Sequence, residues 1–318
     1  MNAPRIVVVG SVNMDLVFTT VRLPAPGETV PASSFAQIPG GKGANQAVAA
    51  AREGAQVIMI GHVGDDAAGS QLRLALANDG ILVEHLTSIP GTPSGVAGIM
   101  VDAEGQNSIL VAGGANGCLA AARVRQLAPV IQGAGLLICQ LETPLASVTE
   151  AIAIARTAGV PVLFNPAPVQ ALPPGLLAKI DYLVVNETEA AALSGIEAFD
   201  GPSALRAAAA LRAAGARAVL LTMGAKGVCL SSEDHTALLP AIAVRAIDTT
   251  AAGDTFVGSF AVAIAQGATV LEAAGRARYA AALAVLRAGA QVSIPLRAEI
   301  DQFIRSQNAA QHADSDLA

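Results

Sequence analysis

An acidic residue has an unusual setting in residues 248–258, which read DTTAAGDTFVG. Asp254 directly follows Ala251, Ala252 and Gly253, at the start of an apolar segment that predicts a helix. One interpretation is a helix N-cap, which stabilises a helix by about 1 kcal/mol. In the other, unobstructed backbone amides and the helix dipole hold a phosphoryl group, while the carboxylate accepts the proton of an attacking hydroxyl. The spacing alone leaves both interpretations open.

A glycine-rich stretch, IPGGKGANQAVAAAR at residues 38–52, leads into an alanine-rich segment of helical composition. Its Gly41, Lys42 and Gly43 would let backbone amides approach an anionic or polyhydroxyl ligand at the helix start. An ordinary turn before a helix is the more common use of such glycines. The stretch is not a GxxxxGK(S/T) phosphate loop, and it is not GxGxxG because Gln46 stands where the third glycine is needed.

Two further pairs of polar residues follow predicted strands. In GSVNMD, Asn13 and Asp15 point the same way if the chain is extended, which suits the mixed donors and acceptors of sugar hydroxyls. An Asx-stabilised loop would explain the same pattern. In NETE, Asn186 and Glu189 share a face of a predicted helical turn. They indicate either a capping box or a contact with hydrated Mg²⁺.

The elements that must position these residues alternate between strands and helices. Short apolar runs predict strands at residues 6–10, 57–61, 135–140, 160–165, 182–186 and 218–224. Helical periodicity covers residues 43–54, 67–78, 146–158 and 203–214. This alternation predicts an α/β fold with a mostly parallel central sheet flanked by helices on both faces. Ligands of such sheets bind beyond the carboxyl ends of the strands, where Asn165, Asn186 and Thr222 stand.

Residues 11–39 and 92–116 interrupt the alternation. The second stretch contains GVAGIMV and NSILV joined by DAEGQ, which is typical of a β-hairpin. We predict that the two stretches form a small β-sheet lid on a single α/β domain, residues 1–308. The polar residues 309–318 are predicted to form a flexible tail.

Composition argues against several classes of function. The chain has 318 residues, 53% of them hydrophobic, but no apolar run approaches the roughly 18 residues of a membrane span. The apolar residues 6–9 are too few for a signal peptide. A net charge of -6 without basic clusters argues against nucleic acid, and the scattered Cys118, Cys139 and Cys229 argue against disulfides or a zinc site. We expect a cytoplasmic protein with a small-molecule partner and no membrane association.

Taken together, these stretches resemble the ribokinase/PfkB family of carbohydrate kinases. The matching motifs span nearly the whole chain in order: GSVNMD, GGKGANQAVAA, QLETP, NPAP, NETEA, LTMGAKG, DTTAAGDTF and RAGAQVSIP. The resemblance implies a ribokinase-like three-layer sandwich that transfers phosphate from ATP to the 5-hydroxyl of D-ribose, giving ribose 5-phosphate and ADP. A family member acting on deoxyribose, a nucleoside or a keto sugar acid is the alternative. A non-catalytic sugar-binding regulator is a third, which the presence of both Asp254 and Gly253 disfavours.

The resemblance also implies roles for single positions. Asp254 is the catalytic base, and Gly253 belongs to the anion hole. The sugar-binding positions are Asn13, Met14, Asp15, Gly41, Lys42, Gly43, Asn45, Glu142 and Asp254. The ATP-binding positions are Asn186, Thr222, Gly224, Gly227, Gly253 and Arg278. The sugar-binding side chains match family members that use ribose. Arg278 departs from the His or Asn that is common near adenine in the family, while the other ATP-binding positions match.

Two cations and a dimer are implied as well. Mg²⁺ is expected between the phosphates and Glu189, which it contacts through water. A monovalent cation, usually K⁺, is expected at Asp248, Thr250, Ala284, Arg287, Gly289 and Ser293, partly through backbone carbonyls. The family commonly forms homodimers through the lid, and here Ile99, Val101, Ile109 and Val111 would supply an apolar face. The same alternation fits a lid that closes only over its own subunit.

Overall fold

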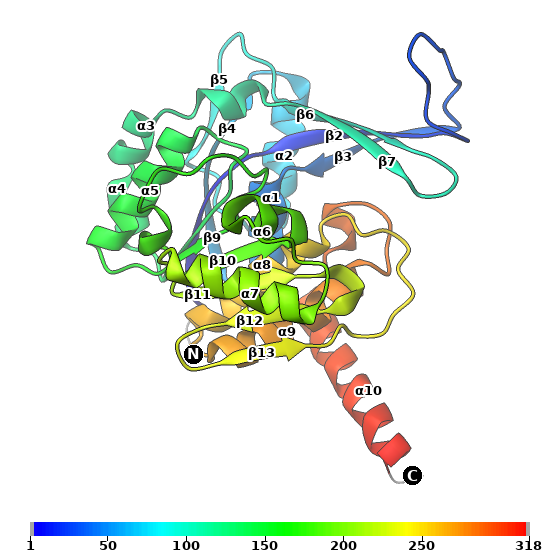
Figure 1. Ribbon diagram of the computed structural model, residues 1–318. Helices are drawn as coiled ribbons and strands as arrows, with labels where there is room; N and C mark the ends of the chain where they lie inside the picture. Colours follow the sequence, from blue (N-terminus) through cyan, green and yellow to red (C-terminus); the bar gives the residue numbers. More distant parts are fainter. Residues whose placement is uncertain (1–2, 316–318) are drawn as a thin grey trace.

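A nine-stranded sheet forms the centre of the computed structural model, which describes residues 3–315 (Figure 1). The strand order is β13-β12-β11-β10-β9-β8-β1-β4-β5. The parallel strands are β1 (Arg5–Val9), β4 (Gln56–Gly64), β5 (Leu86–Ile89), β8 (Leu136–Cys139), β9 (Val162–Phe164), β10 (Tyr182–Asn186) and β11 (Ala218–Thr222). At one edge, β12 (Val228–Ser231) and β13 (Thr236–Leu239) are antiparallel.

Alternate residues of a strand enter different hydrophobic cores. In β1, Ile6 and Val8 belong to one core, whereas Val7 and Val9 belong to the other. All four are fully buried. Because side chains of a strand alternate between its faces, a continuous apolar run is stable only when both faces of the sheet are covered. The predicted three-layer α/β fold is therefore confirmed.

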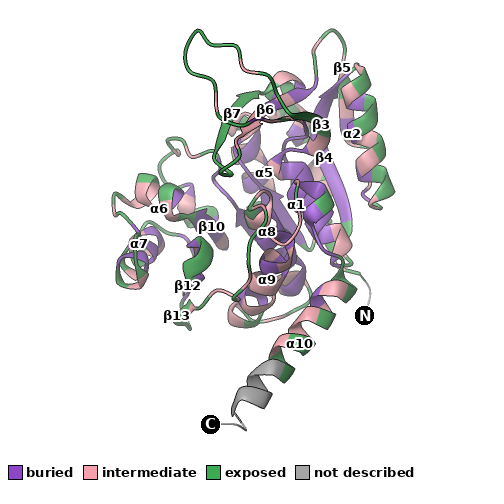
Figure 2. Ribbon diagram, turned by 90° about the vertical axis from the view of Figure 1, so that its right-hand side faces the viewer, coloured by how far each residue is buried: buried purple, intermediate pink, exposed green. Residues whose placement is uncertain are grey.

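Helices form the two outer layers (Figure 2). The first core is completed by α1 (Lys42–Arg52), α2 (Ala67–Asn78), α8 (Ala252–Ala265) and α9 (Val270–Ala284). The second is completed by α3 (Ala121–Gln126), α4 (Ala128–Gln132), α5 (Leu145–Thr157), α6 (Glu187–Ser194) and α7 (Gly201–Ala213). The C-terminal α10 (Arg297–Ser315) contacts α9, where the rings of Tyr279 and Phe303 meet edge to face with centroids 6.1 Å apart. Short 3₁₀ helices lie at Gly114–Cys118, Leu177–Lys179, Gly224–Lys226 and Gln291–Ser293.

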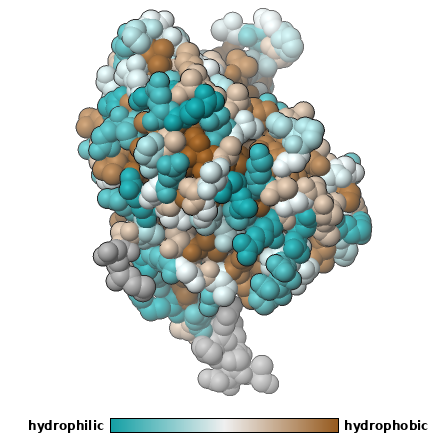
Figure 3. Space-filling model, turned by 90° about the vertical axis from the view of Figure 1, so that its left-hand side faces the viewer, coloured by the Kyte–Doolittle hydropathy of each residue, from teal (hydrophilic) through white to brown (hydrophobic). Residues whose placement is uncertain are grey.

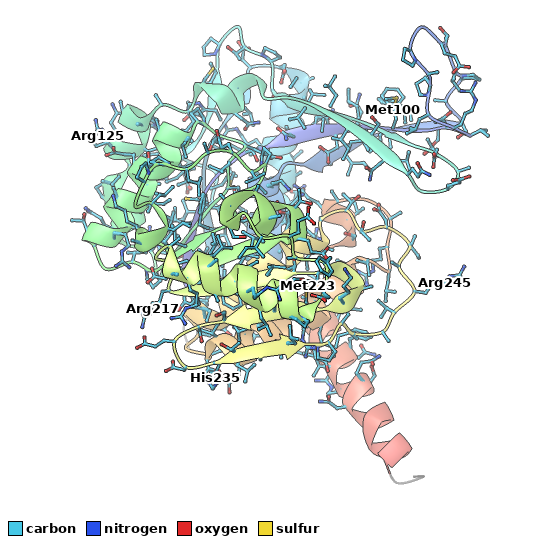
Figure 4. All side chains as sticks on the ribbon, in the orientation of Figure 1. Met100, Arg125, Arg217, Met223, His235 and Arg245 are labelled. Carbon is cyan, nitrogen blue, oxygen red and sulfur yellow. The ribbon has the colours of Figure 1, made fainter. Side chains whose placement is uncertain are left out.

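A second, four-stranded sheet projects from one side of the molecule (Figure 1). Its strands, in the order β3-β2-β6-β7, are β2 (Asn13–Thr19), β3 (Ser34–Gly40), β6 (Gly95–Val101) and β7 (Asn107–Ala112), and they are called the lid sheet below. Every residue of β7 is exposed (Figure 2). Met100 lies on this sheet, and Arg245 projects outward on the same side from the loop before α8 (Figure 4). The small additional sheet expected from the sequence is thus present.

The structure matches most predicted elements and extends others. The predicted helix at 67–78 coincides with α2, and each predicted strand overlaps a strand of the large sheet. The antiparallel pair β12 and β13 was not foreseen. The predicted tail, residues 309–318, is helical up to Ser315 in α10, and its last three residues lie outside those described. The single-domain boundary at residue 308 and the mobility of the tail remain predictions.

Apolar residues do not gather in one place on the face that Figure 3 draws, apart from its undescribed grey atoms. Hydrophilic and hydrophobic residues are interspersed over the described part of the face drawn in Figure 3. Among the described residues, no helix combines the length and the apolar character needed to cross a bilayer.

Candidate active site

Polar residues meet at the carboxyl edge of the parallel strands. β1 lies between β4 and β8, and the strand order reverses there, which is where ligands bind in open α/β sheets. The residues at or just after the strand ends on one side of β1 are Gln140, Asn165, Asn186 and Thr222. The chain that leaves β1 enters the lid sheet as β2. The fold therefore brings the predicted strand-end residues to one edge, next to the lid sheet.

Glycines let the segment after β1 touch the start of α1. A Cβ atom on Gly43 would lie 2.5 Å from the Ser11 nitrogen, and one on Gly41 would lie 2.8 Å from the Asn13 nitrogen. Gly41 also has a φ of 91°, which residues with a side chain rarely adopt. Close packing therefore requires these glycines, and they do more than form an ordinary turn.

Asp254 occupies the first turn of α8 without capping it. The N-cap is Ala251, in the left-handed region with φ 60°, and no side chain caps this helix. Both carboxylate oxygens of Asp254 instead accept hydrogen bonds from α1. Oδ2 accepts from Asn45 Nδ2 at 2.9 Å, and Oδ1 accepts from Gln46 Nε2 at 2.9 Å. The N-cap interpretation of Asp254 is wrong.

A close crossing of α1 and α8 sets the spacing of this contact. A Cβ atom on Gly258 would lie 2.4 Å from Cβ of Ala49. Gly258 is one helical turn beyond Asp254, and Ala49 is one turn beyond Asn45. The small residues at the crossing therefore hold the first turns of the two helices within hydrogen-bonding distance.

The site contains amide residues that the sequence analysis did not assign. Gln46 is completely buried; it donates to Asn165 Oδ1 at 3.1 Å and accepts from Gln140 Nε2 at 2.6 Å. These two partners of Gln46 directly follow β8 and β9, and each is more than ninety residues from Gln46 in the sequence. The only sequence signal was the position of these amides at a helix start and at strand ends.

Glu142 is fixed by contacts with both sides of the glycine-rich turn. Its Oε2 accepts from Ser11 Oγ at 2.6 Å and from the backbone nitrogen of Lys42 at 3.0 Å. The same hydroxyl of Ser11 accepts from the Gly43 nitrogen at 3.2 Å. Ser11 was not predicted as a site residue, and it orients the predicted Glu142.

Asn116, also unpredicted, orients Asn13. Its Nδ2 donates to Asn13 Oδ1 at 2.7 Å, and its side chain pairs with both the nitrogen and the carbonyl of Val12 at 2.9 and 3.1 Å. A Cβ atom on Gly95 would lie 2.2 Å from Asn13 Oδ1, so this position requires glycine. Because Asn13 Oδ1 is occupied, the amide NH₂ of Asn13 is the group left for a ligand.

A cavity of about 470 Å³ lies under the outer strand of the lid sheet. It is lined by Asn13, Lys42, Ile109, Val111, Gly113, Asn116, Glu142 and Pro168. Predicted sugar-binding residues thus form its polar wall, and two apolar side chains of β7 cover it. A second cavity, of about 550 Å³, is lined by residues 169–175 and parts of neighbouring helices without a titratable side chain. The chemistry therefore belongs to the smaller cavity.

Several carboxylates surround Lys42. Burial, together with the charges of Glu142 and Asp254, raises the pKa of Asp15 to about 7. Burial also raises the pKa of Asp254, against the lowering effect of Lys42 and of its two amide partners. For Lys42, burial alone would lower the pKa, but the charges of Asp254, Glu142 and Glu189 outweigh it and raise the pKa. Lys42 therefore stays charged and offsets part of this negative charge.

The predicted nucleotide positions flank the ends of β10 and β11. Asn186 and Thr222 are paired in register. Asn186 and Glu189 form a capping box at α6, in which the Glu189 carboxylate accepts from Asn186 N at 2.9 Å and Nδ2 at 3.0 Å. Gly224 and Gly227 have φ values of 52° and 102°. The capping-box interpretation of NETE is confirmed.

Arg278 contacts a different part of the structure from the other predicted nucleotide positions. It lies on α9 and donates from Nη1 to the carbonyl of Pro240, just after β13. Within the described structure it forms no hydrogen bond with the other predicted nucleotide positions. The structure thus connects Arg278 to the loop after β13.

The predicted cation positions come from two loops that Asp248 joins. Its Oδ1 accepts from Thr250 N at 2.9 Å and from Thr250 Oγ1 at 2.6 Å, and its Oδ2 accepts from Gly289 N at 2.8 Å. The hydrogen bonds from Thr250 and Gly289 overcome burial and lower the pKa of Asp248, so the carboxylate is ionised. Of the other three predicted positions, Ala284 ends α9, Arg287 follows it, and Ser293 ends the 3₁₀ helix Gln291–Ser293.

The fold agrees with comparison to known proteins. The chain matches the pfkB family of carbohydrate kinases over residues 3–297, and it belongs to this family. It is 43% identical over 297 residues to a ribokinase of Haemophilus influenzae, covering 93% of this chain and 97% of the relative. It is 39% identical over 300 residues to a deoxyribokinase of Salmonella typhi, covering 94% and 97%. The structure of Arabidopsis thaliana ribokinase complexed with ribose and ATP aligns with a TM-score of 0.88 at 34% identity, covering 95% and 98%.

Proposed function

We propose that this chain transfers the γ-phosphoryl group of ATP to the 5-hydroxyl of D-ribose, giving ribose 5-phosphate and ADP. The observation that carries the proposal is the buried Asp254 carboxylate in the first turn of α8, held by Asn45 next to the cavity that Lys42 and Glu142 line. The similarity to ribokinases of 37–43% identity over nearly the whole chain supports ribose as substrate.

The cavity and the polar residues near it offer the mixture of donors and acceptors that a sugar requires. Asn13 presents its NH₂, since Asn116 occupies its oxygen. Asp15 offers a carboxylate, and Lys42 offers an ammonium group. Asn45 Oδ1 is buried without a partner, which makes it free to accept from a hydroxyl. Adjacent sugar hydroxyls act as donor and acceptor at once, so such paired groups are suited to bind them.

In the transfer step, Asp254 accepts the proton of the 5-hydroxyl while that oxygen forms a bond to the γ-phosphorus. The bond between this phosphorus and the bridging oxygen of ADP breaks at the same time, and ADP leaves with the electron pair. Gly253, with open space around its Cβ position, exposes the N-terminal amides of α8 to the charge that develops on the phosphoryl oxygens. The loose transition state of phosphoryl transfer requires mainly such alignment and charge stabilisation.

For ATP we propose contacts at Asn186, Thr222, Gly224, Gly227 and Arg278. Mg²⁺, when bound, neutralises phosphate charge. Both oxygens of Glu189 already accept hydrogen bonds from Asn186, which fits a contact with a hydrated ion better than direct ligation.

For K⁺ we propose the positions around Asp248. One carboxylate and several carbonyls, on two adjoining loops, are the hard oxygen ligands that such a cation prefers.

A second candidate is phosphorylation of deoxyribose, because a deoxyribokinase is nearly as similar to this chain as the ribokinases are. A coupled ADP assay with ribose, deoxyribose, fructose, adenosine and a keto sugar acid, in ATP and Mg²⁺ with and without K⁺, separates the candidates. We expect the highest kcat/KM with ribose. Higher kcat/KM with deoxyribose would favour the second candidate, and no turnover of any sugar would contradict both.

We also propose that the protein is cytoplasmic, since it consumes ATP, and that it forms a homodimer through the lid sheet. The lid sheet exposes Phe18, Phe35, Ile109, Leu110 and Val111, and the rings of the first two lie 4.9 Å apart. Leu110, 79% exposed, alternates with the residues that cover the cavity. Sedimentation should give a dimer for the unaltered protein and a monomer for Leu110→Asp, whereas an unchanged sedimentation coefficient would contradict the lid interface.

A further inference from the structure

A chain of buried amides ends on Asp254. Gln140 Nε2 donates to Gln46 Oε1 at 2.6 Å, and Gln46 Nε2 donates to Asp254 Oδ1 at 2.9 Å and to Asn165 Oδ1 at 3.1 Å. Asn165 Nδ2 in turn donates to the carbonyl of Val184 at 3.0 Å. Gln46, Gln140 and Asn165 are each at most 9% exposed.

The partners at the ends of this chain fix the direction of every amide. A main-chain carbonyl only accepts, so Asn165 must turn its NH₂ to Val184 and its oxygen to Gln46. An ionised carboxylate also only accepts, so Gln46 must direct its NH₂ at Asp254. Both hydrogens of that NH₂ are then used, and the oxygen of Gln46 is held by the NH₂ of Gln140. A reversed Gln46 would place its oxygen against two other acceptors.

The charged groups around Asp254 show why this neutral donor matters. Lys42 on α1 is the cation that acts on the Asp254 charge. The charge of Glu142, just after β8, acts against the ionisation of Asp254. The charge of Asp254 in turn raises the pKa of two further carboxyl groups, Asp15 on β2 and Glu189 on α6. In a buried site with more acids than cations, hydrogen bonds from amides favour the ionised form of a carboxylate.

We propose that Gln46 is a positioning residue for the base. Held by Gln140, it fixes the orientation of the Asp254 carboxylate and keeps it an acceptor, so that the free lone pairs can take the proton of the substrate hydroxyl. The side-chain oxygen and both amide hydrogens of Gln46 are already engaged by Gln140, Asp254 and Asn165, so its contribution is to turnover and to the pH dependence of turnover rather than to sugar affinity. This inference rests on the proposed kinase activity.

The test is Gln46→Glu, compared with Gln126→Glu, which makes the same chemical change at an exposed position of α3. In Gln46→Glu two carboxyl groups would share one proton, and such pairs have one strongly raised pKa. We expect the acidic limb of the kcat–pH profile to move up by about one pH unit or more, kcat at pH 7 to fall about 10- to 100-fold, and the KM for ribose to change little. Gln126→Glu should behave as the unaltered protein does.

Two further variants separate positioning from folding. Gln46→Met is neutral and similar in size, and it supplies the test if the buried carboxylate prevents folding; its profile should shift in the same direction. The double change Gln46→Glu with Asp254→Asn restores a single acid to the pair, so it should recover the melting temperature without recovering kcat. A folded Gln46→Glu or Gln46→Met with an unshifted profile, or with a change confined to KM, would overturn the inference. Lack of kinase activity in the unaltered protein would instead refute the proposed function.

Discussion

Asn45 donates a hydrogen bond of 2.9 Å to Asp254, although the two residues are 209 positions apart in the sequence. Each lies in the first turn of its helix, Asn45 in α1 and Asp254 in α8. The other polar atom of the Asn45 side chain, Oδ1, is buried and has no partner. One side chain of α1 therefore contacts the proposed base and retains an acceptor oxygen without a partner among the described residues.

Replacing Asp254 by Asn should separate binding from chemistry. The amide keeps the size of the side chain but cannot accept the proton, so kcat for ribose should fall by about 10²- to 10⁴-fold while KM changes little. Steady-state kinetics with ribose and ATP measure both constants. Asp234→Asn, at an exposed turn between β12 and β13, is the control. Near-normal turnover by Asp254→Asn would remove the base assignment.

Replacing Asn116 by Leu should weaken sugar binding through Asn13. Without its partner, the Asn13 amide loses its fixed direction, and we expect the KM for ribose to rise about tenfold, equivalent to about 1.4 kcal/mol. The lost bonds to Val12 should also lower the free energy of unfolding by about 1–3 kcal/mol. Asn78→Leu, on the exposed end of α2, controls for the change of composition. An unchanged KM in a folded Asn116→Leu would show that Asn13 needs no such support.

The sequence predicted the layers of the fold better than the contacts of the site. The spacing of apolar residues and their composition reveal which segments are strands. A continuous apolar run also predicts that neighbours such as Ile6 and Val7 are buried on opposite faces of the sheet, as they are. The partner of a buried amide does not follow from local sequence. Gln140 meets Gln46 only because β8 ends beside α1, and Asn116 reaches Asn13 only because β6 pairs with β2. Such contacts depend on topology and register.

The choice between an N-cap and a base at Asp254 shows the same limit. In the sequence, an N-cap and a catalytic base have the same appearance, because each is an aspartate at the start of a predicted helix. The structure excludes the N-cap because Ala251 occupies the cap position and the Asp254 carboxylate turns toward another helix, and the role of base remains a proposal. By contrast, the NETE motif was local, and its capping box formed as one of its two interpretations expected.

Asp15→Asn should stabilise the protein more at pH 8 than at pH 5. The pKa of Asp15 rises from its ordinary 3.8 to about 7 on folding, so the unfolded chain releases this proton at a lower pH than the folded chain does. Between these values the charge on Asp15 increasingly disfavours the folded state, and above pH 7 the cost is constant. The gain in unfolding free energy from Asp15→Asn should thus grow by about 2.6 kcal/mol from pH 5 to pH 8.

Urea denaturation at the two pH values, with Asp234→Asn as control, measures this difference. The control changes an exposed aspartate and should show the same small effect at both pH values. An equal gain for Asp15→Asn at pH 5 and pH 8 would contradict the linkage. Weaker ribose binding by the stabilised variant would show that the crowded carboxylates serve the sugar at the expense of stability.

Gly258→Ala should disturb the crossing that holds Asp254 against α1. The added Cβ would lie 2.4 Å from Ala49 Cβ and 2.8 Å from the Ala50 nitrogen, so the helices must move apart. Overpacking of this kind costs about 1–3 kcal/mol, and kcat should fall as the Asn45 and Gln46 contacts lengthen. Gly275→Ala is the matched control, because its Cβ on α9 would meet no atom within 4 Å and should add about 0.5–1 kcal/mol of stability. Calorimetry and kinetics should therefore give opposite signs of stability change for the two variants.

Replacing K⁺ by tetramethylammonium should lower activity if the two loops joined by Asp248 hold a monovalent cation. The Asp248 carboxylate bridges Thr250, just before α8, and Gly289, after α9, so a cation bound there would stabilise the segment that leads into the Gly253 anion hole. The expected effect is on kcat, because the loops lie outside the residues that line the sugar cavity. Asp248→Asn keeps the size of the side chain and removes its charge, so this variant should have low activity that no longer responds to K⁺. Equal activity of the unaltered protein in both cations would eliminate the cation site, and a K⁺ response retained by Asp248→Asn would place it elsewhere.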